Sequence, residues 1–285
     1  CEILARSKHY LRIRAPITKI LNLPQIDGVR FVRSPRVPSS HARTGEGVGL
    51  TRATALHQSG FTGLGAKVAV IDVGFDGMDS AVGAGELPPG IITRDFTGRG
   101  LGGDNVHGTA VAEIIHEMAP DAELSLLRIG DIVSLENAGE FAEEWGAHIV
   151  NMSAGWPALG FGDGTGPACD VVNKATNQGI LWVNAAGNEG KKVYMHLFAD
   201  RNNNGWHDVD GESEILEISE ALEGEEISFT LTWNDWPLTS EDYDLAIVHL
   251  PVEGSVEVVE TAYTVQLDSR PVEVATHIVR VSGRY

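Results

Sequence analysis

Short apolar runs alternate with helix-like patterns between residues 41 and 190. The runs lie at residues 67–71, 124–127, 148–152 and 180–183. Runs of this length that lack polar alternation are typical of parallel strands buried on both faces. Apolar residues at helical spacing follow between them, for example at residues 109–118. The alternation predicts an α/β fold in which a parallel sheet carries helices on both faces.

The chain divides into three stretches of different character. Residues 1–40 are basic and end in a linker that contains Pro and Ser, and residues 41–190 carry the strand–helix alternation. Residues 191–285 change to the two-residue period of antiparallel strands, with strict alternation at 227–233 and many β-branched side chains at 272–281. We therefore expect three parts, of which the last is a small antiparallel β-sandwich inserted after the α/β part.

The net charge of −19 is concentrated in the last stretch, because residues 202–269 contain 17 Asp or Glu and no Lys or Arg. Proteins that bind nucleic acid present Lys and Arg to the phosphates, so this composition argues against a nucleic-acid partner there. No apolar run has the length of a membrane-spanning helix. The two cysteines, Cys1 and Cys169, have no metal-ligand spacing.

Residues suited to acid–base chemistry stand at the predicted strand ends and helix starts. Asp72 follows the first run, His107 precedes Gly108 and Thr109 at a helix start, and Asn188 follows the fourth run. The carboxyl ends of parallel strands meet at one edge of a sheet, where functional groups gather. A carboxylate can orient a histidine, a histidine can take a proton from a hydroxyl, and an amide can stabilise an oxyanion.

Each of these residues alone has an ordinary structural explanation, such as a helix cap for Asp72, a surface histidine for His107 or a turn for Asn188. Together, four blocks resemble the motifs of the subtilisin family of serine peptidases: VAVID at 68–72, HGT at 107–109, NMSAG at 151–155 and AAGN at 185–188. The order Asp, then His, fits that family and does not fit the chymotrypsin-like or α/β-hydrolase order.

The resemblance covers about residues 45–190 and implies a role for each matched position. Asp72 would orient His107, which would act first as general base and then as general acid. Asn188 would donate its side-chain N–H to the oxyanion. Ser153, Ala154 and Gly155 would form one wall of the substrate cleft, along which an extended peptide could lie.

The nucleophile of the family is not found in the sequence. Its serine normally follows the asparagine in a Gly-Thr-Ser motif, and nothing from Glu189 to Tyr285 matches that motif. We therefore expect the serine to lie beyond Tyr285 and this chain alone to be inactive. On that view residues 191–285 are an insert that precedes the serine, and residues 1–40 resemble the tail of an inhibitory propeptide.

The resemblance implies a serine endopeptidase that acts on polypeptides in the extracellular space or cell envelope. It implies no required cofactor, and it makes the protein's own propeptide a candidate inhibitor. One alternative is a non-catalytic pseudo-peptidase or peptide-binding module, which would use Ser153–Gly155 or the acidic insert. A nucleotide-binding α/β domain is not favoured, because no glycine-rich phosphate loop follows residues 67–71.

Residues 200–208 have the spacing of the front of a calcium loop. Asp200, Asn202, Asn204 and Asp208 supply oxygens at positions 1, 3, 5 and 9, with a glycine at position 6. Position 12 is Gly211 rather than a bidentate Glu, and no flanking helices are evident. Two interpretations stay open: a calcium site that pins the insert, and an Asn- and Gly-rich turn in an acidic region.

Overall fold

The chain forms two compact units, Cys1–Ala42 and Arg43–Tyr285, which are described separately. The computed structural model describes residues 45–285 apart from 157–158, 189–191, 212 and 218–219; before residue 45 it describes 2–6, 11–20, 22–23, 26 and 29. The first unit contains the antiparallel strands β1 (Glu2–Arg6) and β2 (Leu11–Arg14) and the short helix α1 (Ile17–Ile20). The linker expected before residue 41 lies outside the described residues.

Five parallel strands form the main sheet of the second unit, in the order β4-β5-β3-β6-β7. They are β3 (Lys67–Asp72), β4 (Ile92–Asp95), β5 (Glu123–Arg128), β6 (Ile149–Met152) and β7 (Leu181–Asn184). The central strand β3 pairs with β5 on one side and with β6 on the other. Its last residue, Asp72, therefore stands at the carboxyl edge of the sheet, with a neighbouring strand on both sides.

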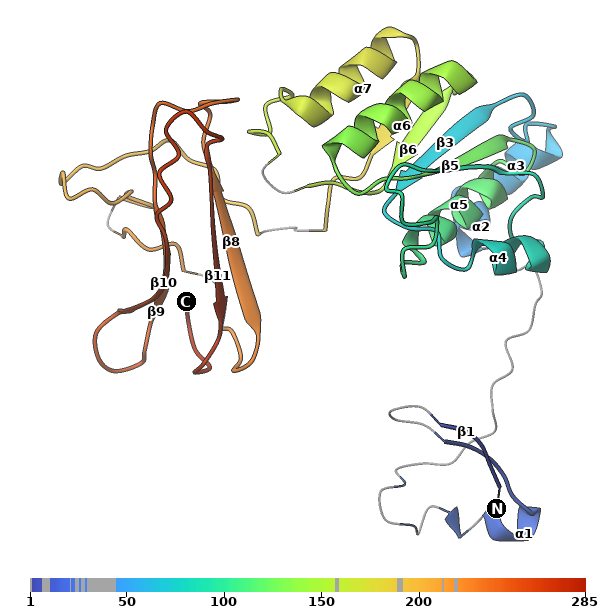
Figure 1. Cartoon of the computed structure of the whole chain (residues 1–285), viewed down its shortest axis with the longest axis horizontal. Helices are drawn as coiled ribbons and strands as arrows, with labels where there is room; N and C mark the ends of the chain where they lie inside the picture. The colour runs from blue at the N-terminus through green and yellow to red at the C-terminus, as the bar shows by residue number, and fades with distance from the viewer. Residues whose placement is uncertain are drawn as a thin grey trace. The chain divides into compact units, whose positions relative to one another are not determined.

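Helices cover both faces of this sheet (Figure 1). They are α2 (Glu46–Leu50), α3 (Ala53–Gln58), α4 (Met78–Ala84), α5 (His107–Met118), α6 (Ile132–Trp145) and α7 (Pro167–Asn177). On β3, Ala69 and Ile71 pack against α6 and α7, whereas Val68 and Val70 pack against α4 and α5. Because strand residues alternate between faces, one apolar strand supplies both cores. The predicted α/β class is confirmed.

Two small antiparallel sheets follow the parallel sheet in sequence. Strand β8 (Glu226–Thr232) pairs with β11 (Val272–Ile278), and β9 (Leu245–His249) pairs with β10 (Glu257–Ala262). Ile247 of β9 and Ala275 of β11 belong to one hydrophobic core, so the two sheets pack on each other as a small sandwich. The antiparallel unit expected after residue 190 is therefore present. Among the described residues, no helix combines the length and the apolar character that a bilayer crossing requires.

Candidate active site

Asp72 is fully buried at the end of β3, with an exposed fraction of 0%. Its Oδ1 accepts the backbone N–H of Val73 at 2.8 Å, and its Oδ2 lies 2.8 Å from Nδ1 of His107. A buried carboxylate is stable only when its oxygens are hydrogen-bonded, and both oxygens have a partner here. The carboxylate is therefore held in a fixed orientation towards the imidazole.

His107 begins helix α5, and its side chain is 52% exposed. Its backbone N–H donates to Oδ1 of Asn105 at 2.9 Å, which fixes the first turn of the helix. When Nδ1 of the neutral ring donates to Asp72, Nε2 is left as the acceptor. The ring thus has one nitrogen tied to the carboxylate and the other available to a hydroxyl that approaches from solvent.

Gly108 and Thr109 join the helix that carries His107 to the loop that follows Asp72. The N–H of Gly108 donates to the carbonyl of Gly74 at 3.0 Å, and Oγ1 of Thr109 donates to the carbonyl of Asp76 at 2.9 Å. A Cβ at position 108 would lie 2.6 Å from that Gly74 oxygen and 2.8 Å from Cβ of Asp72. Only glycine fits this contact, which explains why it follows the histidine.

Ser153, Ala154 and Gly155 follow β6 at the same edge of the sheet as Asp72. Ser153 and Ala154 are half-buried, Gly155 is exposed, and Oγ of Ser153 accepts a hydrogen bond from Asn151 at 3.0 Å. Their backbone groups make no hydrogen bond with another backbone group of the described residues. The segment therefore offers unpaired donors and acceptors, which is what the pairing of an extended peptide requires.

Asn188 lies four residues beyond the end of β7 and is exposed. Gly187 before it has a φ of 87°, a left-handed conformation that turns the chain at this point. Within the described part of the chain, the side-chain amide of Asn188 forms no hydrogen bond, so it is free to donate to a ligand. The structure thus places Asp72 and His107 in contact and leaves Asn188 as a separate, solvent-facing donor beyond the same edge of the sheet.

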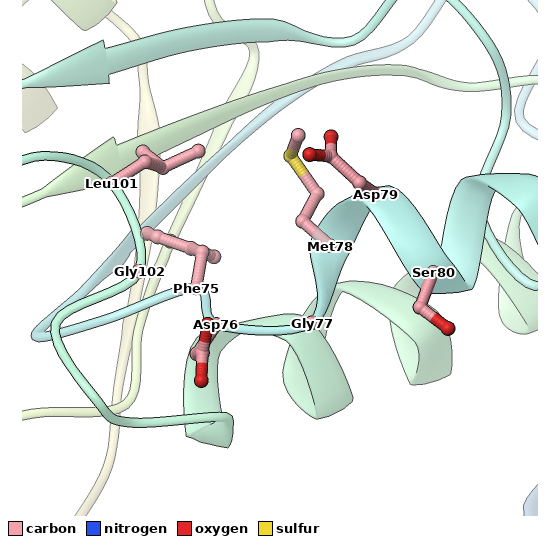
Figure 2. Close-up of a pocket in the computed structure, with 8 residues that line it drawn as sticks. All are labelled: Phe75, Asp76, Gly77, Met78, Asp79, Ser80, Leu101 and Gly102. Atoms are coloured by element: carbon pink, nitrogen blue, oxygen red, sulfur yellow. The ribbon is translucent and has the colours of Figure 1, made fainter.

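A hollow of about 380 Å³ adjoins the loops that follow Asp72 and precede His107 (Figure 2). It is lined by Phe75, Asp76, Gly77, Met78, Asp79, Ser80, Leu101 and Gly102. Figure 2 shows Leu101 and Gly102 on one loop, facing the start of α4 on the other. This hollow could not be predicted from the sequence, because its walls come from segments that only the folded chain brings together.

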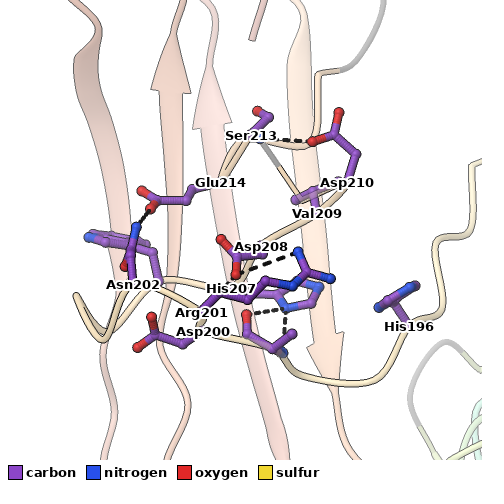
Figure 3. A network of polar contacts seen from close by, with 12 residues as sticks. His196, Asp200, Arg201, Asn202, His207, Asp208, Val209, Asp210, Ser213 and Glu214 are labelled. Atoms are coloured by element: carbon purple, nitrogen blue, oxygen red, sulfur yellow. Dashed lines mark hydrogen bonds and ion pairs between the residues drawn. The ribbon is translucent and has the colours of Figure 1, made fainter.

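The loop at residues 200–208 is organised by its own polar side chains (Figure 3). Asp200 accepts the backbone N–H groups of Asn204 and Gly205 at 3.1 and 2.9 Å. Asp208 is buried and accepts the backbone N–H of Arg201 at 2.7 Å, with the Arg201 guanidinium 3.8 Å away. Asp208 therefore interacts with the backbone and the side chain of Arg201, whereas Asp200 interacts only with backbone N–H groups of the turn among the contacts of the described residues.

Glu214 joins this loop, although the calcium-loop spacing did not include it. Its Oε1 accepts hydrogen bonds from the side-chain amides of Asn202 and Asn204 at 2.8 and 2.7 Å. In the described part of the chain, no group of three or more His, Cys, Asp or Glu is placed to hold a metal ion. Oδ1 of Asp200 and Oδ1 of Asn202 both accept the backbone N–H of Asn204, whereas Oδ1 of Asn204 accepts the N–H of Trp206. Calcium binding stays a prediction.

The chain is similar to curated subtilisins. Subtilisin Savinase of Lederbergia lenta is 32% identical over 162 residues, which cover 50% of this chain and 55% of that protein. Subtilisin E of Bacillus subtilis (strain 168) is 30% identical over 186 residues, which cover 60% of this chain and 47% of that protein. The chain is subtilisin-like. This confirms the resemblance inferred from the four sequence blocks.

The subtilisin-like chain spans about half the length of the curated relatives it matches. Among solved structures, a lanthipeptide protease superposes with a TM-score of 0.40 and 24% identity, over 50% of this chain and 45% of that chain. No protein-family model matches the sequence. These comparisons support the resemblance to subtilisins. They do not test the roles of Asp72, His107 and Asn188, which stay predictions.

Proposed function

We propose that this subtilisin-like chain supplies the aspartate and histidine of a serine endopeptidase. The observation that supports the proposal most is the 2.8 Å contact between Oδ2 of the buried Asp72 and Nδ1 of the half-exposed His107. A carboxylate in this position selects the tautomer in which Nε2 can accept a proton. The serine would come from residues beyond Tyr285.

The proposed reaction uses these groups in sequence. Nε2 of His107 accepts the serine proton while the serine oxygen attacks the peptide carbonyl, and Asn188 donates to the oxyanion that forms. His107 then gives the proton to the departing amine, which leaves an acyl-enzyme. Water, deprotonated by His107, releases the acyl group. Asp72 keeps its charge throughout and stabilises the imidazolium ring.

The substrate in this proposal is a polypeptide, held in extended form along Ser153–Gly155. The chain would act in the extracellular space or the cell envelope, and residues 1–40 would belong to a propeptide that inhibits the enzyme. The proposal includes no nucleic-acid partner and no required cofactor.

A longer clone, read past Tyr285, tests the proposal. We expect a Gly-Thr-Ser sequence before an apolar helix, and we expect the purified protein to hydrolyse casein-like substrates. The alternative is a peptide-binding module, for which the reading frame would end near Tyr285 and peptides would bind without being cleaved. An extended protein that contains the motif but cleaves no peptide under any condition tried would contradict the peptidase proposal.

Substitution of Asn188 by alanine in that longer protein is expected to lower kcat by about 10²–10³-fold with little change in KM. This magnitude is the one known for the equivalent donor of subtilisin itself. The physical reason is that the amide meets the oxyanion only as negative charge develops. Asn177→Ala, an exposed asparagine at the end of α7, serves as the matched control and should keep the full rate. Equal rates for the two variants would remove Asn188 from the proposed mechanism.

We also propose that the loop of Asp200, Asn202 and Asn204 takes one calcium ion, because hard oxygen ligands suit that ion. Isothermal titration should give one Ca²⁺ per chain, and the melting temperature should rise with Ca²⁺ concentration, since a ligand that binds only the folded state stabilises it. Asp200→Asn should abolish both effects. Asp268→Asn makes the same charge change at an exposed position of the same acidic stretch and should abolish neither. Equal titrations for the two variants would contradict the site.

A further inference from the structure

Arg128 is a buried cation on the strand next to that of Asp72. It is the last residue of strand β5, and in the sheet register its backbone lies opposite Asp72 of β3 on one side and opposite Asp95 of β4 on the other. Its exposed fraction is 9%. A guanidinium removed from water must donate its N–H groups to protein acceptors, or its burial is strongly unfavourable. The acceptors that Arg128 uses therefore show which parts of the structure it holds in place.

Those acceptors are backbone carbonyls of two different loops. Nε donates to the carbonyl of Val73 at 3.0 Å, and Nη1 donates to the carbonyl of Gly100. Val73 follows Asp72 directly, and its N–H is the group that binds Oδ1 of Asp72. Gly100 belongs to the loop that leads from β4 to His107. One planar guanidinium thus bridges two loops: the loop that follows Asp72, here called the aspartate loop, and the loop of residues 96–106 that leads to His107, here called the histidine loop.

Further hydrogen bonds join the aspartate loop and the histidine loop close to Asp72 and His107. Phe75 N–H donates to the carbonyl of Leu101 at 3.0 Å, and Asp76 N–H donates to the carbonyl of Asn105 at 2.9 Å. The Asn105 side chain in turn accepts the backbone N–H of His107. A shift of either loop at the guanidinium would therefore move Asp72 and His107 relative to each other.

The histidine loop is shaped around Arg128. Gly103 has a φ of 71°, and a Cβ there would lie 2.6 Å from Nη2 of Arg128. On the other side, Asp95 accepts hydrogen bonds from Thr97 and from the Gly100 N–H. Burial opposes ionisation of Asp95, but these hydrogen bonds and the charge of Arg128 together bring its pKa below the ordinary value. Gly100 is thus held through its N–H by Asp95 and through its carbonyl by Arg128.

We propose that Arg128 is a positioning residue that fixes the geometry of Asp72 and His107 by holding their two loops together. The inference rests on the proposed function, because this geometry matters to catalysis only if the pair is catalytic. Lysine would not replace arginine fully, since an ammonium is a compact point charge, whereas the guanidinium presents donors in a rigid fork that reaches two carbonyls at once.

The first test needs no enzymatic activity and uses the chain as it stands. NMR of ¹⁵N-labelled protein should show the Nδ1–H of His107 as a strongly downfield, slowly exchanging proton, because it donates to a buried carboxylate. In Arg128→Met that signal should broaden or disappear while the far-UV CD spectrum stays that of the parent. Arg128→Lys should restore part of it. A folded Arg128→Met protein with an unchanged Nδ1–H signal would overturn the proposal.

The second test measures kinetics in the longer clone. A misplacement of about 1 Å costs on the order of 10²-fold in rate, so Arg128→Met should lower kcat by roughly that factor while KM changes little. Arg94→Met, an exposed arginine on the adjacent strand β4, is the matched control and should keep both the NMR signal and the rate. Parent-like kinetics for a folded Arg128→Met protein would also overturn the proposal.

A further variant separates positioning from folding. Gly103→Ala leaves Arg128 in the chain but places a methyl group 2.6 Å from Nη2, closer than two such atoms can approach, so it should displace the guanidinium and reproduce the loss of the Nδ1–H signal. If Arg128→Met does not fold, this variant decides the question, and an unchanged signal would contradict the proposal. Failure of the proposed function is a different result: an extended parent protein that never cleaves peptides, whatever the NMR shows.

Discussion

Replacement of His107 by alanine in a longer clone that contains the serine is expected to lower kcat for a casein-like substrate by about 10⁶-fold. That magnitude is the one measured for the triad histidine of subtilisin itself. The physical reason is that Nε2 of His107 is the proposed proton acceptor, and its partner Asp72 is too deeply buried to reach the nucleophile in its place. KM should change little, because the imidazole contributes to the transition state rather than to substrate binding.

A second histidine provides the control for this result. His148 is exposed and stands just before β6, at the opposite edge of the sheet from His107. His148→Ala removes the same type of side chain from the same α/β part, so it should keep the parent rate. A His107→Ala protein that hydrolyses peptides as fast as the His148→Ala protein would show that the hydrolysis has another origin.

Asp72→Asn should have the second largest effect, a decrease of about 10⁴-fold in kcat. The amide nearly preserves the size of the side chain, but its NH₂ group can donate to Nδ1 and so hold the ring in the wrong tautomer. The fully buried position leaves no water to compensate. Initial rates measure the loss, and ¹⁵N shifts of His107 should show the proton on Nε2 instead of Nδ1.

Asp121→Asn is the control for the aspartate, since Asp121 is exposed and precedes β5 at the opposite edge of the sheet. It should change neither the rate nor the histidine tautomer. If Asp72→Asn kept both the parent rate and the Nδ1–H tautomer, Asp72 would be a structural carboxylate with no part in orienting His107.

The parallel sheet could be predicted because its inner strands are buried on both faces and read as continuous apolar runs. This signal identified the inner strands β3, β5 and β6. It also identified β7, but the expectation that this strand is buried is wrong, because β7 lies at the edge of the sheet and Leu181 and Val183 are exposed. The signal missed β4 (Ile92–Asp95), a half-buried edge strand of four residues that includes an exposed arginine. It also missed β1 and β2, where charged and apolar residues are mixed in strands of five and four residues. Short strands in which charged and apolar residues are mixed carry too little apolar pattern to stand out.

The proximity of Asp72 and His107 was predictable because both stand where the carboxyl edge of a parallel sheet gathers side chains. Arg128 ends a strand in the same way, yet a single arginine at a strand end is usually a solvated charge. Only the folded chain shows that the carbonyls of Val73 and Gly100 surround it. Glu214 was missed for a related reason, because it lies outside the residue spacing on which the calcium-loop prediction depends.

Fluorophosphonate labelling of the longer protein shows whether Asp72 and His107 activate a serine, because this reagent reacts with a serine only when a base activates it. We expect one labelled serine, located by peptide mapping beyond Tyr285, and we expect the labelling to be lost in His107→Ala but retained in His148→Ala. Labelling at the same rate in the parent and in His107→Ala, or no labelled serine in a folded protein that contains the Gly-Thr-Ser sequence, would contradict the proposed roles of Asp72 and His107.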